Sequence, residues 1–199
     1  MLANAVTLSR LFFLALSIYL LHLPTVPARA GAFFLIIFTI LVDAIDGAIA
    51  RRRGKSTPLG AILDIAIDRV VENVFWITFV SLELVPLWVA LVVVTRGILT
   101  DAVRGFAMGQ GLTPFAMMQT EWGRWLVSHR FMRAAYGLLK AITFPALALL
   151  HTLRLALPGA VYLATVEPVV FALVLLTVAM TLLRGIPVLV EARRFFRAG

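Results

Sequence analysis

The apolar residues of this chain fall into six long runs that are separated by turn residues. The runs cover residues 7–23, 31–51, 59–81, 85–107, 133–152 and 160–184. A helix needs about 20 predominantly apolar residues to cross a bilayer, and each run is close to that length. The breaks contain Pro24, Pro27, Gly54, Pro58, Pro86, Gly109, Gly111, Pro114 and Pro158, which are residue types that end helices. The pattern predicts an all-α integral membrane protein with six transmembrane helices, built as a single domain over residues 1–199.

Composition supports this class and narrows the chemistry. Hydrophobic residues make up 62% of the 199 residues and charged residues 14%, whereas soluble domains have about 45–50% and about 25%. The chain has no cysteine, which excludes disulfides and thiolate metal sites. Its net charge of +8 comes mostly from residues at the ends of the apolar runs. This placement favours contact with anionic lipid over binding of nucleic acid.

The basic residues also predict an orientation in the membrane. One set of loops and ends contains Arg51, Arg52, Arg53, Lys55, Arg124, Arg130, Arg193, Arg194 and Arg197. The opposite set contains only Arg29 and Arg154. Because cytoplasmic loops carry the excess of lysine and arginine, we expect both termini to face the cytoplasm.

Two segments are expected to lie in the membrane interface as short helical pieces. The connection from Gly105 to Met132 contains Trp122, Trp125 and Phe131 among Arg124, His129 and Arg130. The tail from Pro187 to Gly199 also mixes apolar and basic residues. Such mixtures are typical of helices at the level of the lipid headgroups.

Four aspartates stand out inside the apolar runs. Asp43 and Asp46 are three residues apart, and Asp64 and Asp68 are four apart, so each pair shares one face of its predicted helix. A short loop joins the two helices, so the four carboxylates can converge near one end of a helix pair. Ionisable residues within a membrane span are costly to bury and mark a functional site by default.

Four carboxylates in a site of low dielectric constant repel one another unless a cation binds between them. Oxygen ligands favour a hard ion such as Mg²⁺, Mn²⁺ or Ca²⁺, and no histidine lies in these two runs to favour zinc. Magnesium in proteins is often bound by a few carboxylates together with substrate phosphates. The aspartates therefore predict a metal–diphosphate site. A cation transporter is the alternative, although its carboxylates should lie nearer mid-bilayer than these, which adjoin an arginine-rich loop.

The sequence from Asp43 to Asp68 resembles a known family signature. It reads Asp43-x2-Asp46-Gly47-x2-Ala50-Arg51, then eight residues, then Gly60-x3-Asp64-x3-Asp68. This is similar at every specified position to the pattern D-x2-D-G-x2-A-R-x8-G-x3-D-x3-D of the CDP-alcohol phosphotransferases.

The resemblance implies an enzyme of phospholipid biosynthesis that transfers a substituted phosphate group and releases CMP. It implies that Asp43, Asp46, Asp64 and Asp68 bind Mg²⁺ or Mn²⁺, with two ions expected, and that Asp68 is also the general base. Residues expected to contact the CDP-lipid are Asn4, Thr7, Asp43, Gly47, Ala50, Arg51 and Gly60. The family also implies a homodimer, with the active site on the cytoplasmic side of the inner membrane of a bacterial or archaeal cell.

The acceptor alcohol depends on weaker similarities. The run Asn4-x2-Thr7-x2-Arg10 is similar to the start of the bacterial phosphatidylglycerophosphate synthases. Arg96, Asp101 and Arg104 resemble their basic–acidic–basic pattern, although Gly97 stands where an acid is expected. Asp68-Arg69 looks more like the inositol-phosphate branch.

Five basic residues are candidates to bind a phosphate on the acceptor, namely Arg96, Arg104, Arg130, Arg133 and Lys140. The alternative is that Arg96 and Arg104 pair with Asp101 and Glu72, while the side chains of Arg130 and Arg133 extend to the headgroups. We expect CDP-diacylglycerol as the donor and glycerol 3-phosphate as the acceptor. Inositol phosphate or another alcohol is the alternative acceptor.

Overall fold

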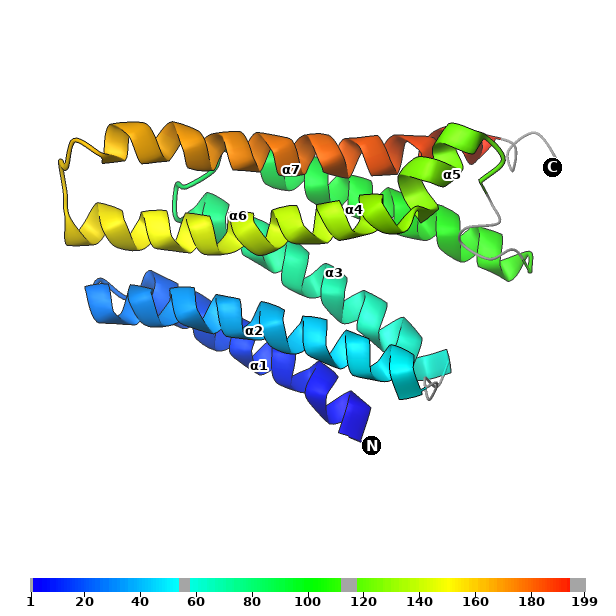
Figure 1. The fold of residues 1–199 in the computed structure, drawn as a ribbon, viewed down its shortest axis with the longest axis horizontal. Coiled ribbons are helices and arrows are strands. Elements are labelled where there is room, and N and C mark those ends of the chain that lie inside the picture. The colour runs from blue at the N-terminus through cyan, green and yellow to red at the C-terminus, as the bar shows by residue number, and fades with distance from the viewer. Residues whose placement is uncertain (1, 54–57, 112–117, 194–199) are drawn as a thin grey trace. The chain divides into compact units, whose positions relative to one another are not determined.

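The computed structural model describes residues 2–53, 58–111 and 118–193, with side chains described for residues 9–42, 63, 65–111 and 118–193. Its elements in this part of the chain are all α-helices (Figure 1). They are α1 (Leu2–His22), α2 (Val26–Arg53), α3 (Pro58–Ser81), α4 (Leu87–Gly109), α5 (Glu121–Ser128), α6 (Arg130–Ala156) and α7 (Leu163–Glu191). The predicted all-α class is confirmed. The six long helices follow the six apolar runs in order, and α5 is the short helix between the fourth and fifth runs.

The end of α7 differs from the prediction. The last apolar run was expected to stop near residue 184, with Pro187 starting an interfacial tail. Instead α7 continues through Pro187 to Glu191. Val188, beyond the proline, is fully buried against Ala107 and Val127, and this packing offsets the hydrogen bond that a proline inside a helix removes. Residues 194–199 of the predicted tail lie outside the described part of the chain.

Two of the described helices, α6 and α7, are long and apolar enough to cross a membrane by length and composition. The segments Ser9–His22 and Val26–Val42 are shorter apolar stretches. These findings are consistent with a membrane protein. The count of six spans and the cytoplasmic position of both termini stay predictions.

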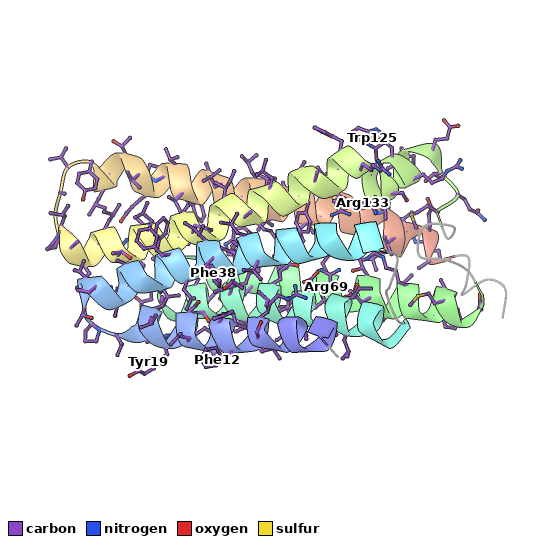
Figure 2. All side chains as sticks on the ribbon, turned by 60° about the horizontal axis from the view of Figure 1, so that its bottom comes forward. Phe12, Tyr19, Phe38, Arg69, Trp125 and Arg133 are labelled. Atoms are coloured by element: carbon purple, nitrogen blue, oxygen red, sulfur yellow. The ribbon has the colours of Figure 1, made fainter. Side chains whose placement is uncertain are left out.

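The chain divides into two compact units. The first contains residues 1–86 and 141–171. Within it α1 packs against α2 and α3, and the Phe144 ring lies 5.3 Å from those of both Phe75 and Trp76. Figure 2 shows Phe12 and Tyr19 pointing away from this unit, and both side chains are exposed. An apolar interior with exposed aromatic side chains on α1 suits a helix that faces lipid.

The second unit contains residues 87–140 and 172–199. Its described core is a cluster of buried side chains from α4, α5, α7 and the segment before α5, namely Ala107, Val127, Val188 and Met118. Tyr136 of α6 is also buried, and its hydroxyl accepts a 3.1 Å hydrogen bond from Thr181 of α7. The short helix α5 is therefore packed into this unit.

Candidate functional site

The four aspartates lie on the two helices that the sequence predicted. Asp43 and Asp46 are in α2, and Asp64 and Asp68 are in α3. Asp43 and Asp68 are each ten residues from the helix end that adjoins residues 54–57, or about 15 Å along the axis. Asp46 and Asp64 are each about 10 Å from that end of their helix. Since α3 runs back in the direction from which α2 comes (Figure 1), the two pairs sit at matching distances from these helix ends.

Most of the residues predicted to bind metal and CDP-lipid have side chains outside the described set. These are Asn4, Thr7, Asp43, Asp46, Gly47, Ala50, Arg51, Gly60 and Asp64. Their roles stay predictions. The structure shows that the backbone at these positions is helical, as the predicted spacing requires.

Asp68 is the member of the signature whose side chain is described. Its Oδ1 accepts a 2.7 Å hydrogen bond from Nη1 of Arg10 on α1. The Arg10 side chain is 6% exposed and that of Asp68 is 54% exposed. A charge-assisted bond of this length is strong when one partner is buried. The carboxylate is thus held by α1 while half of its surface stays open to a ligand.

Arg10 was not among the predicted site residues, although it is the last residue of the Asn4-x2-Thr7-x2-Arg10 run. The sequence contained a sign of this role, because an arginine inside an apolar segment is costly to bury and is expected to pair with an acidic residue or a backbone carbonyl.

The donor set suits the expected metal. Four carboxylates supply only oxygen ligands, which Mg²⁺ and Mn²⁺ prefer. No three acidic, histidine or cysteine side chains gather within the described set. That set omits three of the four aspartates, so the metal site stays a prediction.

A group of arginines occupies the second unit. The guanidinium of Arg184 on α7 lies within range of electrostatic repulsion from Arg96, Arg104 and Arg133. We call these four residues the arginine cluster. Arg96 is buried, with 7% of its surface exposed. The positive charge concentrated here is suited to an anion, and planar guanidinium groups match the geometry of a phosphate.

Tyr136 connects this cluster to another predicted residue. The Arg184 guanidinium lies 5.2 Å from the centre of the Tyr136 ring, and Nζ of Lys140 lies 4.6 Å from it. Both distances are within the range of cation–π attraction. The structure therefore brings together Arg96, Arg104, Arg133 and Lys140 of the predicted acceptor residues. The fifth, Arg130, is exposed at the start of α6, and no described contact joins it to this group.

The pairings expected as the alternative are found in part. Nη1 of Arg104 lies 3.7 Å from Oδ1 of Asp101, an ion pair within α4. Glu72 is buried and pairs at 3.3 Å with Arg69, three residues earlier on α3. The Arg104 contact is long and lies within one helix, so it contributes little to stability.

Arg184 is a residue that the sequence analysis missed. Its Nε and Nη2 atoms donate hydrogen bonds of 3.4 Å and 3.3 Å to the carbonyls of Leu126 and Val127 in α5. Arg184 lies at the end of the last apolar run, where burying a charged side chain costs free energy. That cost was a reason to predict a functional role for this arginine from the sequence.

Gly185 allows α7 to approach the stem of Arg96. A Cβ atom at this position would lie 2.5 Å from Nε, 2.7 Å from Cγ and 3.1 Å from Cδ of Arg96. A Cβ atom essentially never lies as close to another atom as these first two distances, so only glycine leaves room for the Arg96 side chain in its present path.

Paired acids on adjoining helices and a cluster of arginines are features that a protein acting on phosphate-bearing molecules would need. Residues 1–183 match the family described as CDP-alcohol phosphatidyltransferase. The chain belongs to this family, which confirms the resemblance drawn from the signature.

Several curated proteins are similar to parts of the chain. One is a CDP-diacylglycerol–glycerol-3-phosphate 3-phosphatidyltransferase of Pseudomonas fluorescens, 32% identical over 113 residues, or 55% of this chain and 57% of that protein. Another is an archaetidylinositol phosphate synthase of Aeropyrum pernix, 30% identical over 82 residues, or 41% of this chain and 42% of that protein. A putative cardiolipin synthase of Mycobacterium tuberculosis is 34% identical over 79 residues, or 40% of this chain and 38% of that protein. The matched segments thus span 38% to 57% of the length of these relatives.

Proposed function

We propose that this protein is a phospholipid-biosynthesis enzyme that transfers a phosphatidyl group from CDP-diacylglycerol to glycerol 3-phosphate and releases CMP. The arginine cluster is the observation that carries the choice of a phosphorylated acceptor. Family membership over residues 1–183 supports the class of reaction. The name of the Pseudomonas fluorescens relative supports CDP-diacylglycerol as the donor and glycerol 3-phosphate as the acceptor.

In this proposal Asp43, Asp46, Asp64 and Asp68 hold two Mg²⁺ or Mn²⁺ ions. When bound, the ions neutralise the diphosphate and the charge that develops on the leaving CMP. The acceptor hydroxyl attacks the phosphorus of the phosphatidyl group. The new oxygen–phosphorus bond forms as the bond between that phosphorus and the CMP oxygen breaks. The hydroxyl proton passes to the carboxylate of Asp68, which Arg10 holds in place.

The arginine cluster binds the phosphate of the acceptor, with Lys140 near the same tyrosine ring. Because glycerol 3-phosphate and inositol phosphate present the same phosphate group, inositol phosphate is the second candidate. The name of the Aeropyrum pernix relative and the Asp68-Arg69 pair favour it. Family membership favours a transferase over a cation transporter.

The remaining parts of the proposal concern the setting of the enzyme. They are six transmembrane helices in a single domain, a homodimer, and an active site on the cytoplasmic side of the inner membrane of a bacterial or archaeal cell. The alternating distribution of basic residues between loops supports the orientation.

The test is release of CMP from CDP-diacylglycerol by the purified full chain, with glycerol 3-phosphate, inositol phosphate, glycerol and serine offered in turn. We expect activity with glycerol 3-phosphate. The variant Arg184→Gln should lower kcat/KM for this acceptor about 10-fold to 100-fold, since it removes charged hydrogen bonds. Arg154→Gln is the matched control, because Arg154 pairs with Glu167 at 2.8 Å in the first unit. Activity only with glycerol or serine would refute the proposal.

A further inference from the structure

The short helix α5 is fixed at both of its ends by side chains of α7. At its start, the carboxylate of Glu191 accepts hydrogen bonds from the backbone N–H groups of Gln119 at 2.6 Å and Thr120 at 3.2 Å, and from the Thr120 hydroxyl. At its end, Arg184 donates to the carbonyls of Leu126 and Val127. Glu191 thus binds the two residues that precede the helix, and Arg184 binds two of the carbonyls that a helix leaves unbonded at its end.

The charges also have the favourable signs. A carboxylate at the start of a helix and a guanidinium at its end both interact well with the helix dipole. Seven residues separate Arg184 from Glu191, and seven separate Thr120 from Val127, which is about 10.5 Å of helix in each case. The start of α5 therefore lies at Glu191 and its end at Arg184, and Figure 1 shows α5 lying obliquely across the last turns of α7.

The buried face of α5 is shaped for this contact. Its buried residues are Gly123 and Val127, which are four apart and share one face. A Cβ atom on Gly123 would lie 2.7 Å from Oε1 of Glu191 and 2.6 Å from Oγ1 of Thr120. The other face carries Trp122 and Trp125, both exposed, and Figure 2 shows Trp125 pointing away from the helices of its unit. The face of α5 with Gly123 and Val127 is therefore in close contact with its neighbours, and the face with Trp122 and Trp125 is exposed.

These contacts act on Arg184. Its neighbours Arg96, Arg104 and Arg133 repel its guanidinium, and like charges at close range are destabilising unless a favourable contact offsets them. The two α5 carbonyls and the Tyr136 ring supply such contacts. The contacts with α5 and with the Tyr136 ring therefore oppose this repulsion.

We propose that α5 is the element that positions Arg184 for the acceptor phosphate, and that Glu191 and Gly123 act through α5 as positioning residues. The inference rests on the proposed function and deepens it. Glu191 is not expected to touch either substrate, yet its loss should weaken binding of the acceptor and leave binding of the CDP-lipid unchanged. The ligand class is a phosphate monoester, for which a correctly held guanidinium provides two parallel hydrogen bonds.

The experiment measures kcat and both KM values for the full chain in lipid nanodiscs, with Glu191→Ala, Glu191→Gln and Gly123→Ala. We expect Glu191→Ala and Gly123→Ala to raise KM for glycerol 3-phosphate about tenfold, with KM for CDP-diacylglycerol within about twofold of the original. Glu191→Gln keeps an amide oxygen that can accept the backbone hydrogen bonds, so it should recover part of the loss. The inhibition constant of inorganic phosphate against glycerol 3-phosphate should rise together with the acceptor KM.

Glu167→Ala is the matched control, because Glu167 is another α7 carboxylate with an arginine partner, Arg154. The same acceptor-selective effect in this control would overturn the inference. So would equal changes of both KM values in Glu191→Ala and Gly123→Ala, or no change in either. An unsubstituted chain that neither releases CMP with a phosphorylated acceptor nor binds glycerol 3-phosphate would remove the proposed function and this inference together. Loss of binding in Arg184→Gln with normal binding in Glu191→Ala would remove the inference alone.

Discussion

Replacing Gly185 by alanine tests whether the path of the Arg96 side chain sets acceptor binding. The added methyl group would lie 2.7 Å from Cγ and 2.5 Å from Nε of Arg96. Cγ is attached directly to Cβ, so it cannot move away without a change of the first side-chain torsion. The guanidinium at the far end of the side chain must then leave its present position.

The effect on stability should be small and the effect on the site large. Overpacking an interior costs about 1–3 kcal/mol, while alanine is favoured over glycine within a helix by about 1 kcal/mol. The net loss of stability is therefore about 0–2 kcal/mol. A displacement of about 1 Å in a substrate-positioning group can cost about 100-fold in rate. We expect kcat/KM for glycerol 3-phosphate to fall about 10-fold to 100-fold.

The assay is CMP release at saturating CDP-diacylglycerol and varied glycerol 3-phosphate, with thermal unfolding in detergent measured alongside it. Gly97→Ala is the matched control, because Gly97 is buried beside Arg96 in α4 and a Cβ there meets nothing within 4 Å. The control should keep its acceptor kinetics. The reasoning is refuted if Gly185→Ala shows unchanged kinetics, or if both variants lose activity to the same extent.

Three further predictions concern the acids and the core of the first unit. Arg10→Ala should lower kcat about 10-fold or more at saturating substrates, because Asp68 loses its charged hydrogen bond, and Arg10→Lys should restore part of the rate in the same assay. Removal of divalent ions with EDTA should abolish CMP release, and added Mg²⁺ or Mn²⁺ should restore it; full activity after chelation would contradict the metal assignment. Phe144→Ala should lower the unfolding temperature through a loss of about 3–5 kcal/mol, since its ring packs on Phe75, Trp76 and Phe79. An unchanged unfolding temperature would contradict that packing.

The long helices were predictable because their cause is local. A run of about 20 apolar residues in a membrane must satisfy its own backbone hydrogen bonds, and an α-helix does so within the segment. The end of α7 was not predictable in this way. Pro187 is a signal for a helix end, but the burial of Val188 against Val127 depends on a distant segment of the chain.

The site shows the same division between local and distant causes. The spacing of Asp64 and Asp68 fixes their common helix face, and the helical backbone of α3 agrees with it. The bond from Arg10 to Asp68 joins residues 58 positions apart, so spacing alone could not pair them. The contact between Glu191 and Thr120 joins residues 71 positions apart, so spacing alone could not pair these two either.

The partners of three buried or half-buried arginines indicate where we expect the charge of the substrate to bind. Arg10 pairs with Asp68, and Arg104 with Asp101, so each of these positive charges is matched by a carboxylate within the protein. Arg184 differs, because its described partners are two backbone carbonyls and the Tyr136 ring, which carry no net charge. These groups orient the guanidinium without neutralising it. A bound phosphate would neutralise the charge of the Arg184 guanidinium. This is the physical reason for assigning the acceptor phosphate to this end of α7.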